Sequence, residues 1–332
     1  MKILVTGGTG YIGSHTAIEL IKAGHEPIIV DNLVNSKESV LDKIEEISGK
    51  RPCFYKVDLL DVAGLEKVFS ENDFGAVLHF AGLKAVAESV EQPIRYYENN
   101  VVGTVNLLKV MQTHGVKKII FSSSATVYGD VGDGGGLSED LPTGRGITNP
   151  YGRTKFMIEE ILKDECAADG DFSATILRYF NPVGAHESGK IGEDPNGRPN
   201  NLMPIVMKVA SGEYEELSVY GDDYPTNDGT CVRDYIHVVD LAKGHIAALK
   251  NMKNGVQIYN LGTGKGTSVL EMVSAFEKAS GEKLPYKIVE RRAGDLPCLF
   301  CNPEKAEREL EWKAELTIAD VMEDTLRFLR TK

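Results

Sequence analysis

The 332-residue sequence lacks any long apolar run and contains only five cysteines. A membrane-spanning helix needs about 18 or more consecutive apolar residues, so we expect no membrane partner. The cysteines are odd in number and scattered, which favours a reducing compartment over a disulfide framework and predicts a cytoplasmic protein. The close pair Cys298 and Cys301 has no second pair and no histidine nearby, so we predict no metal site.

Positive charge is also scarce, because 37 Lys and Arg residues stand against 49 Asp and Glu residues and the net charge is −12. Such a protein is a poor partner for nucleic acid or for an anionic membrane. A few arginines can still form a local pocket for an anionic small molecule. By a soft rule of about 150 residues per domain, the length suggests two domains or one large α/β body.

The N-terminal residues have the pattern of a dinucleotide-binding site. An apolar run at 3–5 predicts a buried strand, and it is followed by Gly7, Gly10 and Gly13 and then by a helical spacing of apolar residues. A strand, a glycine turn and a helix together can hold a pyrophosphate at the helix N-terminus. The next predicted strand, 26–30, ends in Asp31, where a carboxylate would bind the adenosine ribose and repel a 2′-phosphate. We therefore expect NAD rather than NADP.

Strands and helices then alternate, which is typical of a Rossmann-type doubly wound parallel sheet. The predicted elements are helices at 39–47, 61–69 and from 93 to beyond 111, and strands at 54–57, 76–80, 118–121 and 174–177. Ligands of open parallel sheets lie at the carboxyl ends of the strands, so Asp58 and residues 80–84 should line the cofactor. The serines at 122–124 either bind a sugar or a catalytic tyrosine, or form a simple turn. Asn99 is either a ligand contact or a helix-surface residue.

Tyr151 and Lys155 are four residues apart, next to Pro150 at the start of a predicted helix. At this spacing the phenol and the ammonium lie on one face of the helix. A phenol with a pKa near 10 needs a nearby positive charge to act as a base at neutral pH, and Lys155 could provide it. The spacing alone also arises by chance, but the nucleotide-binding pattern around it favours a catalytic role.

The character of the chain changes near residue 181, where Gly, Pro and Asn cluster and the alternation breaks. This suggests a smaller mixed α/β domain that binds the substrate. We expect the nucleotide-binding domain at 1–180 with about 236–262, and the substrate domain at 181–235 and 263–332. Further predicted elements are helices at 203–210, 268–278 and 318–329 and a strand at 256–260. Arg233 and Arg292 suit a diphosphate, but they could equally form surface ion pairs.

With these residues assembled, the chain resembles the extended short-chain dehydrogenase/reductase superfamily and, within it, the UDP-glucose 4-epimerase family. The similarity runs almost from end to end and includes TGGTGYIGSH from Thr6, FSSSATVYG from Phe121, NPYGRTK from Asn149, LRYFNPVGAH from Leu177 and GTCVRDYIHV from Gly229. The resemblance implies an isomerase of galactose metabolism that interconverts UDP-galactose and UDP-glucose through a transient 4-keto sugar with tightly bound NAD. It also implies a homodimer formed through the helices near 93–112 and 151–163.

On matching positions, Tyr151 would be the base, Lys155 would hold the nicotinamide ribose and lower the tyrosine pKa, and Ser124 would bind the reacting hydroxyl. The implied cofactor contacts are Gly7, Gly10, Tyr11, Ile12, Gly13, Asp31, Asn32, Asn35, Ser36, Asp58, Leu59, Phe80, Ala81, Gly82, Lys84, Asn99, Ser124, Tyr151, Lys155 and Phe180. The implied substrate contacts are Lys84, Ser124, Tyr151, Asn181, Asn201, Leu202, Val219, Tyr220, Arg233, Arg292, Asp295 and Leu299.

One difference from some members of this family concerns the sugar. Several of them have a bulky tyrosine where this chain has Leu299, and a smaller residue would leave room for an N-acetyl group. We therefore expect some activity on UDP-GlcNAc and UDP-GalNAc.

Three other classes of protein share parts of this pattern. A 4,6-dehydratase would need an acid/base pair where this chain has Ala125 and Thr126, so it is disfavoured. Another NAD-dependent sugar-nucleotide epimerase, or an oxidoreductase that releases its cofactor each cycle, remains an alternative. A non-catalytic NAD-binding protein would not need Ser124, Tyr151 and Lys155 together.

Overall fold

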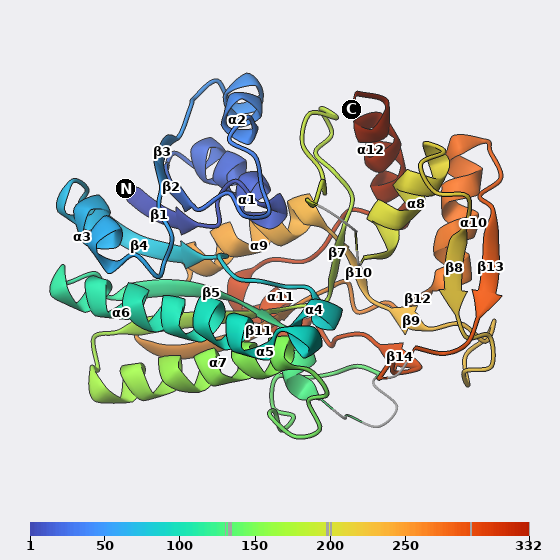
Figure 1. Cartoon of the computed structure of the whole chain (residues 1–332). Coiled ribbons are helices and arrows are strands. Elements are labelled where there is room, and N and C mark those ends of the chain that lie inside the picture. The colour runs from blue at the N-terminus through green and yellow to red at the C-terminus, as the bar shows by residue number, and fades with distance from the viewer. Residues whose placement is uncertain (130, 132–134, 197–198, 200, 293, 332) are drawn as a thin grey trace. The chain divides into compact units, whose positions relative to one another are not determined.

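The computed structural model describes the whole chain except residues 130, 132–134, 197–198, 200, 293 and 332. The chain forms two compact units (Figure 1). The first contains Met1–Asp130, Leu141–Tyr179 and Ala242–Tyr259, and the second contains Val131–Asp140, Phe180–Leu241 and Asn260–Lys332. This division differs from the expected domain boundaries at 131–140, at 236–241 and at 260–262, which all lie in the second unit.

The first unit is built on a seven-stranded sheet with the order β11-β6-β5-β4-β1-β2-β3. The strands are β1 Lys2–Thr6, β2 Glu26–Asp31, β3 Cys53–Lys56, β4 Phe74–His79, β5 Lys118–Ser124, β6 Ser173–Tyr179 and β11 Gly255–Leu261. β1 pairs in parallel with both β2 and β4, and its Val5 lies opposite Ile29 and Leu78. The chain order reverses beside β1, so the predicted Rossmann-type doubly wound sheet is confirmed.

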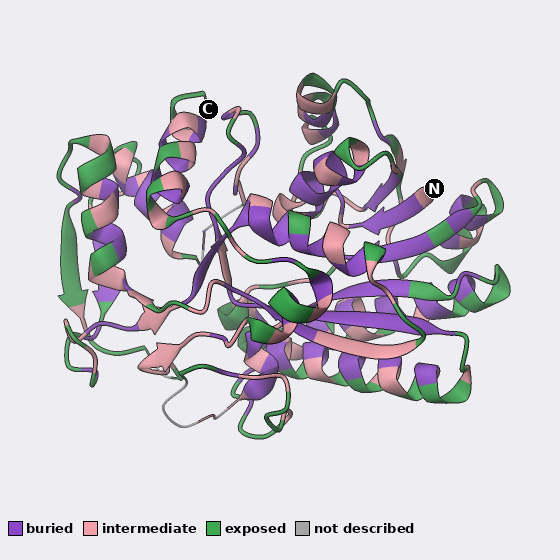
Figure 2. Cartoon of the chain, turned by 180° about the vertical axis from the view of Figure 1, so that it is seen from behind, coloured by how far each residue is buried: buried purple, intermediate pink, exposed green. Residues whose placement is uncertain are grey.

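Helices cover both faces of this sheet. Helices α1 Tyr11–Lys22 and α2 Val40–Ser48 lie on one side in Figure 1, and α3 Val62–Ser70, α6 Gly103–Thr113 and α7 Pro150–Ala168 lie on the other. The central strands are buried, as Figure 2 shows. Helix α9 Val238–Lys250 was not predicted, although its apolar residues have helical spacing.

The long helix expected from residue 93 is confirmed, because helical structure runs without a break from Pro93 to Thr113. This helix consists of α5 Pro93–Tyr96, the wide π-type turn η1 Tyr97–Val102 and α6, and a short helix that was not predicted, α4 Val86–Glu91, precedes it. The buried side chain of Asn100 lies within η1 and bonds the backbone of Leu83 and the hydroxyl of Thr154. Such wide turns are frequent at functional sites, and here the turn directs an amide towards the segment that follows β4.

The second unit contains short strand pairs surrounded by helices. Its strands are β7 Asn181–Val183 with β10 Tyr235–His237, β8 Leu217–Tyr220 with β13 Tyr286–Val289, and β9 Val232–Arg233 between β12 Thr267–Ser268 and β14 Cys298–Leu299. Its other helices are α8 Leu202–Ala210, α10 Val269–Ser280, α11 Glu304–Leu310 and α12 Ile318–Thr331. Helix α10 begins at a capping box in which Ser268 and Glu271 bond each other's backbone N–H. Val206, Phe276 and Met322 belong to the core of this unit.

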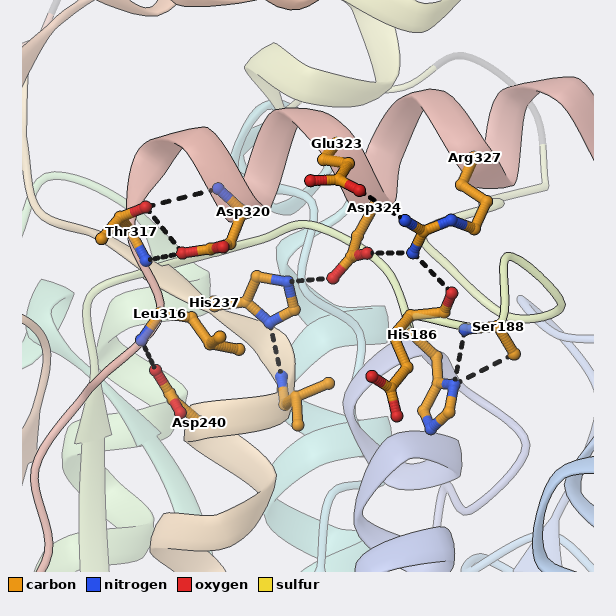
Figure 3. A network of polar contacts seen from close by, with 12 residues as sticks. His186, Ser188, His237, Asp240, Leu316, Thr317, Asp320, Glu323, Asp324 and Arg327 are labelled. Carbon is orange, nitrogen blue, oxygen red and sulfur yellow. Dashed lines mark hydrogen bonds and ion pairs between the residues drawn. The ribbon is translucent and has the colours of Figure 1, made fainter.

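The last helix is attached to this unit by a polar network (Figure 3). His237 Nε2 lies 3.3 Å from Asp324 Oδ2, and Arg327 Nη1 lies 2.6 Å from Asp324 Oδ1. Asp240 Oδ2 accepts the backbone N–H of Leu316 at 2.7 Å, just before α12 begins. In the described part of the chain, no helix combines the length and the apolar character that crossing a bilayer requires.

Candidate active site

The glycine loop between β1 and α1 is shaped by close backbone packing. Gly7 has a φ of +69°, and a Cβ there would lie 2.7 Å from the backbone nitrogen of Ala81. The first turn of α1 has neither a capping side chain at Gly10 nor an acidic side chain. A helix start without such a side chain presents backbone N–H groups to an anion, so the loop fits the pyrophosphate of a dinucleotide.

Asp31 is buried at the carboxyl end of β2 and is held beside this loop. Its Oδ2 accepts the N–H of Thr9 at 3.2 Å, and its Oδ1 accepts the N–H of Leu33 at 2.8 Å and the hydroxyl of Ser36 at 3.1 Å. Asn32 donates its amide to Asp58 Oδ2 at 2.8 Å. The structure therefore gathers four of the residues expected at the adenosine end of the cofactor, namely Asp31, Asn32, Ser36 and Asp58.

His79, at the end of β4, joins the end of β1 to the start of α6. Its Nδ1 lies 2.8 Å from Thr6 Oγ1, and its Nε2 lies 2.8 Å from Thr104 Oγ1. Burial, and secondarily the charge of Lys155, lowers the pKa of His79 to about 3, so the ring is neutral. Thr104 donates to the carbonyl of Asn100, and Thr6 accepts the N–H of Ala81. Nε2 therefore carries the proton and Nδ1 accepts from Thr6.

This chain of hydrogen bonds fixes the backbone at residues 80–82 against the glycine loop. Sequence analysis did not single out His79, because its partners lie 73 and 25 residues away in the chain. Of the other residues expected here, Asn99 donates its amide to Asn100 Oδ1 at 2.9 Å. Lys84 is exposed, with its Nζ 6.0 Å from the centroid of the Tyr11 ring.

The serine, tyrosine and lysine predicted to be catalytic lie on β5 and α7. Asn149 caps α7 by accepting the N–H of Gly152 at 2.9 Å, and Pro150 occupies the first turn. This start places the side chains of Tyr151 and Lys155 towards the end of β5. Lys155 Nζ donates to the carbonyl oxygen of Ser122 at 2.5 Å, and Tyr151 shares a hydrogen bond with the Ser124 side chain.

Burial shifts the pKa values of both catalytic candidates towards their neutral forms. It raises the pKa of Tyr151, against which the bond with Ser124 acts. It lowers the pKa of Lys155 to about 7, and the carboxylate of Glu159 opposes this shift. Lys155 Nζ lies 6.0 Å from the centroid of the Tyr151 ring, and burial outweighs the effect of Ser124 on the pKa of the phenol. The expected lowering of the tyrosine pKa by Lys155 therefore stays a prediction for the chain with its cofactor.

Beside this group lies a buried ion pair that sequence analysis missed. Glu159 accepts two hydrogen bonds from Arg178, at 3.0 and 2.7 Å, and one from Ser123 at 2.5 Å. The Arg178 guanidinium also lies 4.8 Å from the centroid of the Tyr128 ring. The available signal was spacing, because Glu159 follows Tyr151 and Lys155 at successive four-residue steps on α7.

In the second unit, two expected substrate arginines meet at Asp295. Arg292 forms a two-pronged pair with Asp295, at 3.1 and 2.9 Å, and its guanidinium lies 5.4 Å from the centroid of the Tyr220 ring. Arg233 Nη2 lies 3.8 Å from Asp295 Oδ1, and its Nη1 donates to the carbonyl of Leu296 at 2.8 Å. The two alternatives for these arginines, a diphosphate contact and a surface ion pair, both stay open. An ion pair of this kind also presents guanidinium groups that suit a diphosphate.

The remaining expected substrate residues of this unit lie on other segments. Asn201 precedes α8, which begins at Leu202, and donates its amide to Glu193 Oε1 at 2.8 Å. Asn181 begins β7 and bonds the carbonyl of Asp234 through its backbone N–H. Val219 is buried on β8, and Leu299 lies on β14 opposite Arg233. Phe180 is buried just before β7.

The sheet, the glycine loop and the group on β5 and α7 are the features of an enzyme that binds a dinucleotide and exchanges hydrogen with a hydroxylated substrate. Comparison with known proteins identifies the family to which this enzyme belongs. The chain belongs to the NAD dependent epimerase/dehydratase family, which matches residues 3–262.

Three similar proteins are all UDP-glucose 4-epimerases. The chain is 57% identical over 330 residues to the UDP-glucose 4-epimerase of Bacillus subtilis (strain 168), a match that covers 99% of this chain and 96% of the relative. It is 55% identical over 335 residues to the human UDP-glucose 4-epimerase, covering 98% and 96%. The crystal structure of UDP-glucose 4-epimerase from Bifidobacterium longum in complex with NAD+ and UDP is 54% identical, with a TM-score of 0.95, and the match covers 100% of this chain and 98% of that one.

Proposed function

We propose that Tyr151 carries out the proton transfers of this enzyme. The chain is an NAD-dependent isomerase that interconverts UDP-galactose and UDP-glucose through a transient 4-keto sugar, the activity named for relatives that match it over almost their whole length. The observation that carries the proposal is the group in which Ser124 bonds Tyr151 while the buried Lys155 is held by β5 one helical turn away.

In this proposal, Tyr151 accepts the proton of the sugar 4-hydroxyl and later returns it, while Ser124 orients that hydroxyl. NAD, when bound, supplies a two-electron acceptor that takes the hydrogen from sugar C4 and gives it back on the other face. Lys155 binds the nicotinamide ribose and provides positive charge. Lowering the phenol pKa from near 10 to near 7 requires about 4 kcal/mol, which Lys155 and the oxidised cofactor supply together.

The protein residues fit the cofactor because the start of α1 has no side-chain cap and Asp31 is fixed beside the loop. We assign the cofactor contacts to the glycine loop, to Asp31, Asn32, Asn35 and Ser36, to Asp58 and Leu59, to residues 80–84, and to Asn99 and Phe180. The alternative oxidoreductase would release its cofactor at each turnover, whereas an epimerase regenerates NAD and retains it.

The experiment is to incubate the purified protein with UDP-galactose, without added NAD, and to follow formation of UDP-glucose. Tyr151→Phe should lose turnover, and the matched control Tyr286→Phe, at an exposed tyrosine on β13, should keep it. NAD released from the denatured protein should be close to one per chain. Unchanged turnover in Tyr151→Phe would refute the assignment of the base.

For the UDP-sugar, we propose that Arg233 and Arg292 bind the diphosphate and that Tyr220 lies against the nucleotide. Asn181, Asn201, Leu202, Val219 and Asp295 are assigned to the same substrate. The position of both guanidinium groups at Asp295 supports the first assignment. Arg292→Gln should raise KM for UDP-galactose more than it lowers kcat, and an unchanged KM would exclude this contact.

We also propose activity on UDP-N-acetyl sugars, because Leu299 is smaller than the tyrosine of several family members. Leu299→Tyr should then abolish turnover of UDP-GlcNAc while keeping that of UDP-galactose. No detectable turnover of UDP-GlcNAc by the natural chain, at enzyme levels that convert UDP-galactose rapidly, would contradict the proposal.

For assembly, we propose a homodimer formed through the helices near 93–112 and 151–163, which contain α5, η1, α6 and the first part of α7. Large apolar side chains on these helices are exposed, with Ile94 at 76%, Val102 at 45% and Met157 at 42%, and α5 and η1 both contact α7. An apolar patch of this kind is typical of a surface that meets a partner, and a second copy of the chain is the partner that the resemblance implies. Ile94→Glu should convert the dimer to a monomer in sedimentation, and a chain that is monomeric without the change would refute the idea. The cytoplasmic location stays a prediction.

A further inference from the structure

Three consecutive residues at the end of β5 each bind one residue on the facing side of α7. Ser122 accepts Lys155 Nζ through its carbonyl, Ser123 donates to Glu159 and Ser124 bonds Tyr151. Tyr151, Lys155 and Glu159 are spaced at four-residue steps, so they share one helix face. The contact between Ser123 and Glu159 therefore lies in the same row of contacts between β5 and α7 as those made by Lys155 and Tyr151.

Glu159 is also fully buried, with no exposed side-chain surface, and Arg178 on β6 is 2% exposed. The two-pronged pair with Arg178 orients the carboxylate, and this leaves Oε1 directed at Ser123. β5 and β6 are neighbouring strands, in which Ser123 lies opposite Arg178. The carboxylate thus links α7 to both strands at the level of the reacting residues.

We propose that Glu159 is a positioning residue for the reaction, which aligns the end of β5 with α7 so that Ser124 and Lys155 are presented together to Tyr151. This inference rests on the proposed function of Tyr151. The alternative is an ion pair that contributes only to folding, because buried pairs are by themselves weak evidence for any other role.

If Glu159 positions the reacting residues, its charge also acts on Lys155. A residue that contributed only to folding would leave the protonation of Lys155 unchanged. Among the described residues, the titratable groups that act on Lys155 or lie beside it are Tyr151 and Glu159 on α7 and His79 on β4. Tyr179 and Arg178 on β6 act on Tyr151 and Glu159 in turn. His79 and Tyr179 are neutral because burial lowers the pKa of the first and raises that of the second. Glu159 is the carboxylate, among the described residues, whose charge favours the ammonium form of Lys155.

The test is the pH profile of kcat for UDP-galactose in the NAD-containing enzyme. Glu159→Gln keeps the size of the side chain but removes the charge, so Lys155 loses its proton at lower pH. We expect the alkaline limb of the profile to move down by about one pH unit, which is about a tenfold loss of kcat on that limb, with KM unchanged. Glu159→Asp restores the charge and should restore the position of the limb. An alkaline limb that stays in place in Glu159→Gln would overturn the inference.

Ser123→Ala provides a second test that leaves the buried pair intact and does not depend on the folding of Glu159→Gln. It should lower kcat severalfold at constant KM and constant NAD content, because the contact between Ser123 on β5 and Glu159 on α7 is lost. A kcat equal to that of the unchanged chain would contradict the proposal. The proposed function fails if the unchanged chain does not turn over UDP-galactose, or if Tyr151→Phe is active. The inference on Glu159 fails if both of those results are as expected but Ser123→Ala and Glu159→Gln have no effect.

Discussion

Replacing Lys155 with methionine should make the protein more stable while removing its activity. Burial lowers the pKa of Lys155 to about 7 in the folded chain, whereas the unfolded chain keeps the ordinary value of 10.5. Between these pH values the unfolded state binds more protons, so the stability of the natural chain rises with pH through this window. Burying this side chain therefore costs stability at neutral pH.

The magnitude follows from the two pKa values. The lysine costs about 4 kcal/mol of unfolding free energy at pH 7.5 and about 1.4 kcal/mol at pH 9.5. Lys155→Met removes this cost but leaves the carbonyl of Ser122 without its 2.5 Å donor, a loss of about 1 kcal/mol at either pH. The variant should therefore be more stable by about 3 kcal/mol at pH 7.5, and nearly equal to the natural chain at pH 9.5.

Urea unfolding of cofactor-free protein at the two pH values measures this difference. NAD must be absent because Lys155 is proposed to bind it, so bound NAD would stabilise the two chains unequally. Lys109→Met, at an exposed position on α6, is the control for loss of a surface ammonium. A stability difference between Lys155→Met and the natural chain that does not change with pH would refute the reasoning. So would a variant that is less stable than the natural chain at pH 7.5.

Three further outcomes are expected. Arg178→Met leaves the Glu159 carboxylate buried without its partner and should lower the unfolding free energy in urea by about 3–5 kcal/mol. The double variant with Glu159→Leu should recover most of this loss. Equal stability of Arg178→Met and the natural chain would contradict this prediction. Asp31→Asn removes the negative charge beside the glycine loop and should improve NADP relative to NAD by about tenfold in binding titrations, and an unchanged ratio would exclude Asp31 from cofactor choice. Asn149→Ala removes the cap of α7 and should lower the unfolding free energy by about 1 kcal/mol, with a matching fall in kcat if the cap positions Tyr151.

Local patterns were sufficient for much of the fold. The glycines at 7, 10 and 13 follow an apolar run, and the acidic Asp31 ends the next one, so the first strand, turn, helix and strand could be predicted from neighbours in the chain. The start of α7 at Pro150 was predictable for the same reason. The helix expected from residue 93 is also present, but local spacing did not predict its wide turn η1, in which the buried Asn100 bonds Thr154 across 54 residues.

The sequence by itself determined the class of sheet, the cofactor chemistry and the Tyr151 and Lys155 pair, because each depends on residues a few positions apart. Only the tertiary structure decided what surrounds that pair. Glu159 meets Arg178 across 19 residues and Ser123 across 36, and His79 meets Thr6 across 73. Such partners are brought together by strand order and by the packing of α7 on the sheet, and no periodicity in the chain encodes them directly. The same packing raises the pKa of Tyr151 and lowers that of Lys155, because removal from water disfavours the charged form of each.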